Sequence, residues 1–416
     1  MDARGPPISR AVPADAPAPG GSVLFALGLA GVCAFVNFYA TQPLLPLFAK
    51  SFGATKAQAA LTVSAPPIAV ALCSPFVGTL AGRLGRRRVI VVSLFLLSLP
   101  TALAATSGSI GALVTWRFLQ GAVVPGIYAV SIGYVGEAWH GRNVGVALSA
   151  LVSSNVVGGF LGRMLAALAA DRFGWRGAFI ALGALTLGGA LVVLRLLPEA
   201  AHPGPPPAPP ASLGSRVAAL LAPRLLATYA VGFNVLFTLV ATFTYVTFHL
   251  ADPPYSLGPV ALSSVFVVYL VGAVVTPLAG RSIDRVGSRL TLVVAASCGV
   301  AGAALTLTPR LWAVTAGLAV LCSAAFVSQS ASTSYLHRTV GRAIHPTASG
   351  IYVSSYYLGG SAGGVLPALA WRAGGWPACV ALVALVELVT IGLALRYWAR
   401  VGEARGGNGT SAEPAG

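Results

Sequence analysis

Three charged side chains stand inside long apolar stretches of the sequence, where charges are rare: Arg117, Arg163 and Glu387. In apolar surroundings a guanidinium group can bind an anion, and a carboxyl group can bind and release a proton. A further group of charges lies in the segment GRLGRRR at residues 82–88, which separates two apolar stretches and contains no acid. What these residues do depends on the elements that hold them.

The apolar stretches are too long and too numerous for a water-soluble protein. Of the 416 residues 56% are hydrophobic and 9% are charged, and the mean hydropathy is +0.82. Soluble domains carry about 25% charged residues, so most of this surface must face lipid. Runs of about 20 apolar residues cross a bilayer as helices, and long continuous Leu/Ala/Gly-rich runs favour helices over the alternating strands of a barrel. The sequence predicts an all-α membrane protein with twelve spans, at residues 22–47, 57–81, 88–106, 110–135, 143–170, 176–197, 224–248, 259–280, 288–308, 311–334, 346–369 and 376–397.

The basic residues predict how the chain is threaded. With a cytoplasmic N-terminus, 18 of the 26 Lys and Arg residues fall on the cytoplasmic side, as the positive-inside rule requires. Both termini are then cytoplasmic, and the net charge of +16 is largely this topology signal together with contacts to anionic lipid headgroups. Because the arginines are divided among short loops, they form no continuous basic face, and we expect no nucleic-acid partner.

The chain divides into two halves that repeat one another. A Pro-rich linker at 198–223 separates a six-helix bundle at 22–197 from a second at 224–398, between cytoplasmic tails at 1–21 and 399–416. A shift of 202 places Gly78, Arg83, Gly85 and Arg87 on Gly280, Arg285, Gly287 and Arg289. A shift of 201 places the segment around Gly158–Trp175 on the one around Gly359–Trp376. Six spans per half give both halves the same orientation, which predicts a parallel repeat about an axis along the membrane normal.

With these motifs the sequence resembles the major facilitator superfamily, and within it the twelve-span drug/proton-antiporter-like exporters. The resemblance covers about residues 22–398 and is carried by the loop at 78–88, its repeat at 280–289, and Arg117-Phe-Leu-Gln120-Gly121 in the fourth span. It implies that these loops latch one half against the other and release as the transporter changes state. The latch residues would be Gly78, Arg83, Gly85, Arg87, Gly280, Asp284, Arg285, Gly287 and Arg289.

One position departs from the family pattern. Gly82 stands where the family usually has an aspartate, while Asp284 keeps that acid in the second half. We therefore expect the second-half loop to hold the latch more firmly, by charge and helix-dipole contributions of about 1 kcal/mol. Asp284→Asn should then impair transport more than Gly82→Ala, and equal transport rates would contradict this.

The resemblance also implies that the first, fourth, seventh and tenth spans line a central cavity. The polar residues on them that could contact a substrate or a proton are Asn37, Tyr39, Gln42, Arg117, Gln120, Asn234, Tyr245 and Gln329, to which Arg163 and Glu387 are added as membrane-embedded charges. This weakly polar, aromatic lining suits a neutral or anionic amphiphile.

Each of the three embedded charges has a simpler interpretation as well. Arg117, about two turns from the outer side of its span, can extend to the membrane surface. Arg163 lies in GGFLGR, where glycines suit close helix packing. Glu387 has Val383 and Ile391 one turn away, and the resemblance makes its span peripheral, so it can be a neutral structural acid.

The sequence therefore predicts a secondary active transporter of a bacterial inner membrane that exports a small amphiphile in exchange for protons by alternating access. The alternative is uptake of a small metabolite by proton symport or facilitation. The first span lacks an acid, so proton coupling depends on the resemblance and on Glu387. We expect no cofactor, no metal and no enzymatic activity, because nucleotide and zinc motifs are missing from the sequence. A small-molecule substrate and membrane lipids are the expected partners of a functional monomer.

Overall fold

The computed structural model describes residues 20–139, 143–199, 218–341 and 344–398, which form helices and, within these ranges, no strand. The predicted tails and most of the predicted linker lie outside the described residues. The helices are α1 (Gly21–Tyr39), η1 (Gln42–Leu44), α2 (Leu45–Phe52), α3 (Lys56–Leu84), α4 (Arg86–Leu103), η2 (Ala104–Thr106), α5 (Ile110–Ala138), α6 (Asn143–Leu196), α8 (Pro223–Ala251), α9 (Pro259–Val265), α10 (Val268–Leu305), α11 (Leu311–Thr339), α12 (His345–Val365) and α13 (Pro367–Tyr397).

Glycines in the left-handed region end or divide these helices at repeat-related positions. The φ angle is +88° at Gly85 and +84° at Gly287, which are 202 residues apart, and it is +69° at Gly174 and +62° at Gly375, which are 201 apart. A residue with a Cβ atom rarely adopts this backbone conformation. The sequence repeat is therefore also a repeat of backbone conformation, and it divides α6, α10 and α13 into two arms each.

With these breaks the helices form the twelve-helix architecture expected from the hydropathy. The predicted spans at 143–170 and 176–197 are the two arms of α6, and the one at 259–280 consists of α9 and the first arm of α10. Several helices continue beyond the predicted apolar run, as α3 does to Leu84. The segment 82–88 is a tight reversal, because Gly85 is its only residue outside a helix.

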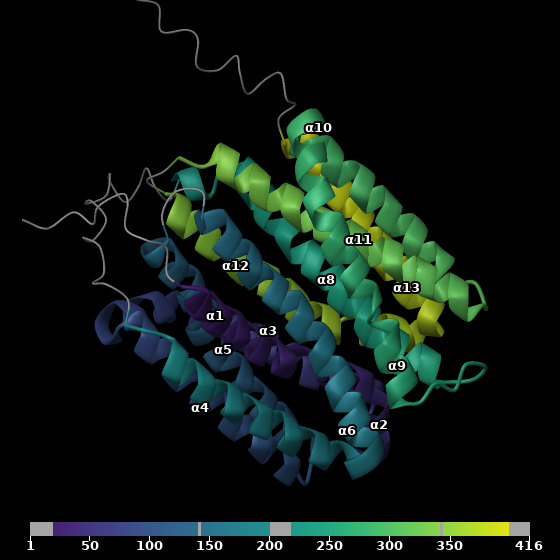
Figure 1. The fold of residues 1–416 in the computed structure, drawn as a ribbon. Helices are drawn as coiled ribbons and strands as arrows, with labels where there is room; N and C mark the ends of the chain where they lie inside the picture. The colour runs from purple at the N-terminus through teal and green to yellow at the C-terminus, as the bar shows by residue number, and fades with distance from the viewer. Residues whose placement is uncertain (1–19, 140–142, 200–217, 342–343, 399–416) are drawn as a thin grey trace, which may run out of the picture.

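The helices pack mainly within each half, and a few pairs connect the halves. Within the halves, α1 packs on α6 and α8 packs on α12. Between the halves, α3 contacts α12 and α6 contacts α9. Figure 1 shows α4 at one side of the molecule and α10, α11 and α13 at the opposite side, with α3, α8 and α12 between them. We call the end that holds α2, residues 53–55 and α9 the Lys56 end, and the opposite end, with the turns at Gly85 and Gly287, the Arg86 end.

Among the described residues, buried apolar side chains of the two halves share one cluster, which joins them towards the Lys56 end. One cluster combines residues of the second half with first-half residues towards the Lys56 end, between residues 36 and 63, 104 and 113, and 166 and 182. The first-half residues towards the Arg86 end form a separate cluster whose buried members all belong to that half. The described residues therefore show halves that are closed together at the Lys56 end.

Candidate substrate and coupling site

Arg117 is fully buried and holds backbone carbonyl groups that the helices leave without partners. Its Nη1 donates to the Asn37 carbonyl at 2.7 Å and its Nη2 to the Phe38 carbonyl at 2.5 Å. Both carbonyls lie in the last turn of α1, where the helix leaves its C=O groups unpaired and where its dipole favours a cation. The predicted alternative that Arg117 extends to the membrane surface is wrong, since its exposure is 0%.

A proline explains the third carbonyl that Arg117 contacts. Its Nε donates to the Thr62 carbonyl at 3.0 Å. In a helix that carbonyl would bond to the N–H of residue 66, and Pro66 has no N–H. The arginine therefore replaces a helical hydrogen bond, and α3 continues as a helix through Pro66 and Pro67.

The polar residues around Arg117 form a closed network inside the first half. Arg117 also donates to Gln120 Oε1, and Gln120 Nε2 donates to Thr101 Oγ1 at 3.2 Å. The Thr101 hydroxyl in turn donates to Asn37 Oδ1 at 3.0 Å, and Asn37 Nδ2 donates to Thr186 Oγ1 at 2.8 Å. Asn37, Arg117 and Gln120 thus lie together, but they connect α1, α3, α4, α5 and α6 within one half. A satisfied buried network of this kind fixes the helices that it joins.

Arg163 is equally buried, and its surroundings come from both halves. Its Nε donates to Gln42 Oε1 at 2.7 Å and its Nη1 to the Gly159 carbonyl at 2.8 Å, while its Nη2 has no hydrogen-bond partner among the described residues. The guanidinium carbon lies 4.5 Å from the ring centroid of Tyr39. It lies 4.6 Å from that of Phe266 and 4.3 Å from that of Tyr269, both in the second half.

The predicted residues of the second half lie in separate places. Glu387 is 6% exposed, and its carboxyl carbon would lie 3.4 Å from a Cβ atom placed on Gly299. None of the ion pairs found between described residues includes Glu387. One turn further along α13, Thr390 accepts a hydrogen bond from Asn234 Nδ2 at 2.9 Å. Tyr245 is also buried, but its hydroxyl donates to the Gly364 carbonyl at 3.1 Å.

Gln329 belongs to neither of these groups. It is half-buried on α11, and its backbone carbonyl accepts the hydroxyl groups of Ser332 and Thr333. The predicted site residues therefore form two clusters in the first half, around Arg117 and around Arg163, and a dispersed set in the second.

Sequence reasoning missed the tyrosines of α12. The Tyr357 ring lies 6.1 Å from that of Phe38 in the first half and 5.6 Å from that of Tyr356. The hydroxyl of Tyr352 lies 2.6 Å from that of Ser332. These tyrosines lie outside the first, fourth, seventh and tenth spans, from which the uncharged candidates were taken. The available signal was three tyrosines in SGIYVSSYYLGG, a stretch otherwise dominated by small residues.

The latch residues contact their own halves in this structure. Arg87 donates to the carbonyls of Leu197 and Leu194, the latter at 2.8 Å, and Arg289 donates to that of Leu395 at 2.6 Å. Leu194 and Leu395 are 201 residues apart, so the two arginines bind equivalent helix ends. Such contacts stabilise the C-terminal carbonyls of a helix.

Other latch positions have a smaller structural role. Arg83 and Arg285 are exposed, and a Cβ atom on Gly78 or Gly280 would meet no atom within 4 Å. The described latch residues make no ion pair between the halves.

Each half has a short ion pair beside its latch, with the charges exchanged, and the first half has a second, longer pair in which Arg88 Nε lies 3.9 Å from Glu199 Oε1. In the second half Arg338 Nη2 lies 2.8 Å from Asp284 Oδ1. In the first half Arg86 Nη2 lies 2.6 Å from Glu137 Oε1, and Glu137 is the repeat equivalent of Arg338. The first half therefore has an acid at this end, although position 82 is a glycine and not an aspartate. Burial does not support the expectation that the second half holds its loop more firmly, because the Arg86–Glu137 pair is less exposed than the Arg338–Asp284 pair.

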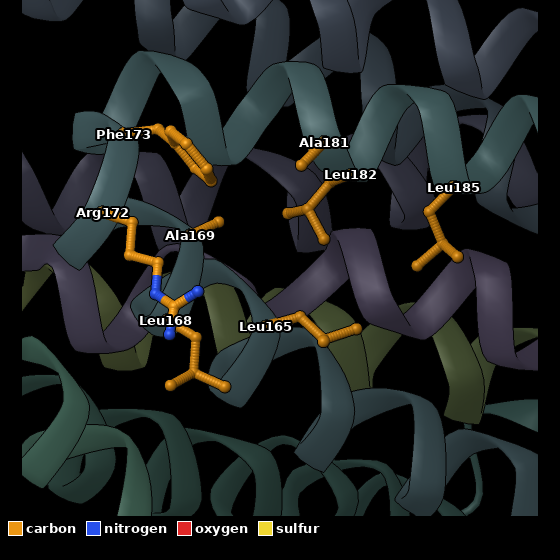
Figure 2. A pocket seen from close by; sticks show the side chains of 8 residues that line it. All are labelled: Leu165, Leu168, Ala169, Arg172, Phe173, Ala181, Leu182 and Leu185. Carbon is orange, nitrogen blue, oxygen red and sulfur yellow. The ribbon is translucent and has the colours of Figure 1, made fainter.

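A cavity of about 480 Å³ lies away from the boundary between the halves. Its lining comes entirely from α6: Leu165, Leu168, Ala169, Arg172, Phe173, Ala181, Leu182 and Leu185. Figure 2 shows aliphatic side chains from both arms of the helix turned towards one space, with the Arg172 guanidinium beside Leu168. Because both arms belong to the first half, a site for a substrate that passes between the halves cannot lie here.

Two repeat-related helical halves, with buried charges between their helices, define a multi-pass membrane protein of the transporter type. The chain belongs to the Major Facilitator Superfamily, whose family model matches residues 27–364. The inner membrane transport protein YnfM of Escherichia coli is 30% identical over 380 residues, 91% of each chain. The uncharacterized MFS-type transporter YybF of Bacillus subtilis is 29% identical over 374 residues, 89% of this chain and 92% of the relative.

Solved structures show the same fold. The nucleoside transporter NupG superposes with a TM-score of 0.76 at 14% identity, over 91% of this chain and all of the other. A bacterial homologue of the human lysosomal transporter Spinster, in an inward-facing and unoccupied conformation, gives a TM-score of 0.71 at 16% identity, over 90% of this chain and 94% of the other. At these identities the likeness concerns the fold alone.

Proposed function

We propose that the chain is a secondary active transporter that exports a small neutral or anionic amphiphile in exchange for protons. The observation that carries the proposal is the asymmetry of the core, which joins the halves at the Lys56 end and leaves them with separate clusters at the Arg86 end. Alternating access needs two halves that separate at one end while they are closed at the other. Rocking about the buried contacts would open the Lys56 end and close the Arg86 end.

The distribution of basic residues supports an orientation for this form. The Arg86 end holds the loops in which most Lys and Arg residues lie, so it faces the cytoplasm by the positive-inside rule. The form described here then faces inward, in the inner membrane of a bacterium, with both termini cytoplasmic. We propose that the monomer is the working unit, since both halves of the path lie in one chain.

Glu387 is the proposed proton carrier. It is buried among helices of the second half and has no ion-pair partner in the described part of the chain. A carboxyl group is costly in this setting and usually has a function. Glu387→Gln should abolish proton movement that depends on substrate, whereas Glu199→Gln, at an exposed acid, should not. Equal proton movement in the two variants would remove Glu387 from the mechanism.

The test of the function uses purified protein in liposomes with an imposed pH gradient and a pH-sensitive dye inside. A panel of small neutral and anionic amphiphiles supplies the substrate. Proton movement opposite to the substrate supports antiport, and movement in the same direction supports the alternative, uptake by symport. Flux of a substrate without any proton movement would contradict coupling and leave facilitated transport.

A further inference from the structure

We propose that Arg163 binds a carboxylate of the transported compound when the halves separate at the Lys56 end, and that Phe266 and Tyr269 occupy this anion site while the halves are closed. The inference rests on the proposed transport function and specifies its substrate class. The two buried arginines, Arg117 and Arg163, have nearly the same exposure but different partners.

Arg117 uses four of its five N–H groups within its own half, which leaves little capacity for a substrate. Three backbone carbonyls and Gln120 accept from all three of its nitrogen atoms, and every acceptor belongs to the first half. Its environment would therefore stay the same when the halves move apart. A cation that is fixed in this way serves the structure of the first half.

Arg163 has unused hydrogen-bonding capacity. A guanidinium group carries five N–H donors. Gln42 and the Gly159 carbonyl each accept one, so both N–H groups of Nη2 and one of Nη1 remain without an acceptor among the described residues, in a site that is 1% exposed. These N–H groups form the fork that binds a carboxylate through two parallel hydrogen bonds.

In the closed form the rings of the second half compensate the charge. Phe266 and Tyr269 place their ring centroids 4.6 and 4.3 Å from the guanidinium carbon. The negative face of an aromatic ring attracts a cation, and more strongly when water is excluded. The rings accept no conventional hydrogen bond from Nη2, however, so the compensation is incomplete. No carboxylate among the described residues pairs with Arg163.

Separation of the halves at the Lys56 end would remove two of the three rings. Tyr39, Gln42 and Gly159 belong to the same half as Arg163 and would remain with it. The guanidinium would then face the opened path, held in a fixed orientation by Gln42, with an aromatic face beside it. This arrangement suits a carboxylate on an apolar or aromatic body. The carboxylate and the rings of the second half compete for one cation, so closure at this end expels the anion.

The test measures opening at the Lys56 end without transport. Ser263 is buried there, and its hydroxyl lies 3.4 Å from the sulfur of Met164 in the other half, so a cysteine at this position reacts only when the halves separate. Ser263→Cys protein in lipid nanodiscs is labelled with a membrane-impermeant maleimide, and its rate is corrected for the protein with serine at 263. The probes are benzoate and, as a neutral match, benzamide.

We expect benzoate, and not benzamide, to accelerate labelling by at least about fivefold, the lower range of allosteric coupling. Arg163→Gln should abolish the acceleration, and Arg176→Gln should retain it, because the contacts of Arg176 within the described residues are with Trp175 and Ser107 of its own half. Phe266→Leu should raise the rate without ligand and lower the benzoate concentration needed for half the effect.

Three results would overturn the proposal: equal action of benzoate and benzamide, a benzoate response that persists in Arg163→Gln, or a Phe266→Leu variant that behaves as its parent. The last variant keeps Arg163, so the test survives if Arg163→Gln fails to fold. Since labelling needs neither a gradient nor flux, a failure of proton-coupled transport in liposomes would leave this result intact, and the two failures are distinguishable.

Discussion

The ion pair between Lys56 and Asp252 joins the two halves where the structure is closed, and its removal should favour opening there. Lys56 Nζ lies 2.7 Å from Asp252 Oδ2. The same ammonium group lies 4.2 Å from the ring centroid of Trp371, which also belongs to the second half. Asp252→Asn removes the ion pair and leaves the ring contact, whereas Lys56→Gln removes both.

The exposure of the pair limits the size of the effect. The two side chains are 33% and 54% exposed, so the pair is worth about 0.2–1 kcal/mol. The cation–π contact adds about 0.5–1 kcal/mol. Asp252→Asn should therefore raise the ratio of open to closed protein by about 1.4- to 5-fold, and Lys56→Gln by about 3- to 30-fold, since 1.4 kcal/mol is a factor of ten.

Labelling of Ser263→Cys by an impermeant maleimide measures this ratio when opening and closing are fast. Lys50→Gln is the matched control, because Lys50 is an exposed lysine of α2 at the same end. The Asp252→Asn effect should shrink at high salt, where exposed charges are screened. Labelling that is faster in Asp252→Asn than in Lys56→Gln, or no difference from Lys50→Gln in either variant, would refute the reasoning.

Three further predictions concern helix packing and charged side chains, and each is checked by thermal unfolding in detergent micelles. Gly162→Ala should destabilise the protein by about 1–3 kcal/mol, because the new Cβ atom would lie 2.1 Å from the Val36 carbonyl oxygen. Gly145→Ala on the same helix should leave the stability unchanged, because its Cβ atom would meet no described atom within 4 Å. Equal melting temperatures of the two variants would contradict this. Arg117→Met should cost about 3 kcal/mol or more, because backbone carbonyls lose their donors, and an unchanged melting temperature would show that water replaces the guanidinium. Glu137→Gln should lower the melting temperature more than Asp284→Asn, because the ion pair of Glu137 is the less exposed one. The reverse order would support the expectation that the second-half loop holds the latch more firmly.

The sequence alone determined the features that depend on local properties. Lipid burial selects apolar runs of fixed length, so the spans could be located from hydropathy. A positive φ at a tight reversal needs glycine, so the repeat of Gly85 at Gly287 predicted two equivalent turns. The sequence also identified Arg117, Arg163 and Glu387, because a charge in an apolar stretch can be recognised without a structure.

Only the tertiary structure decided the partners of these charges. Arg117 reaches the carbonyl that Pro66 leaves free, a contact between residues 55 positions apart. Arg163 meets Phe266 and Tyr269 in the other half, so its partners depend on how the halves are packed. A sequence shows which side chains cannot be left unpaired in lipid, but the choice of partner is made by helices that are distant along the chain and by the conformation of the halves.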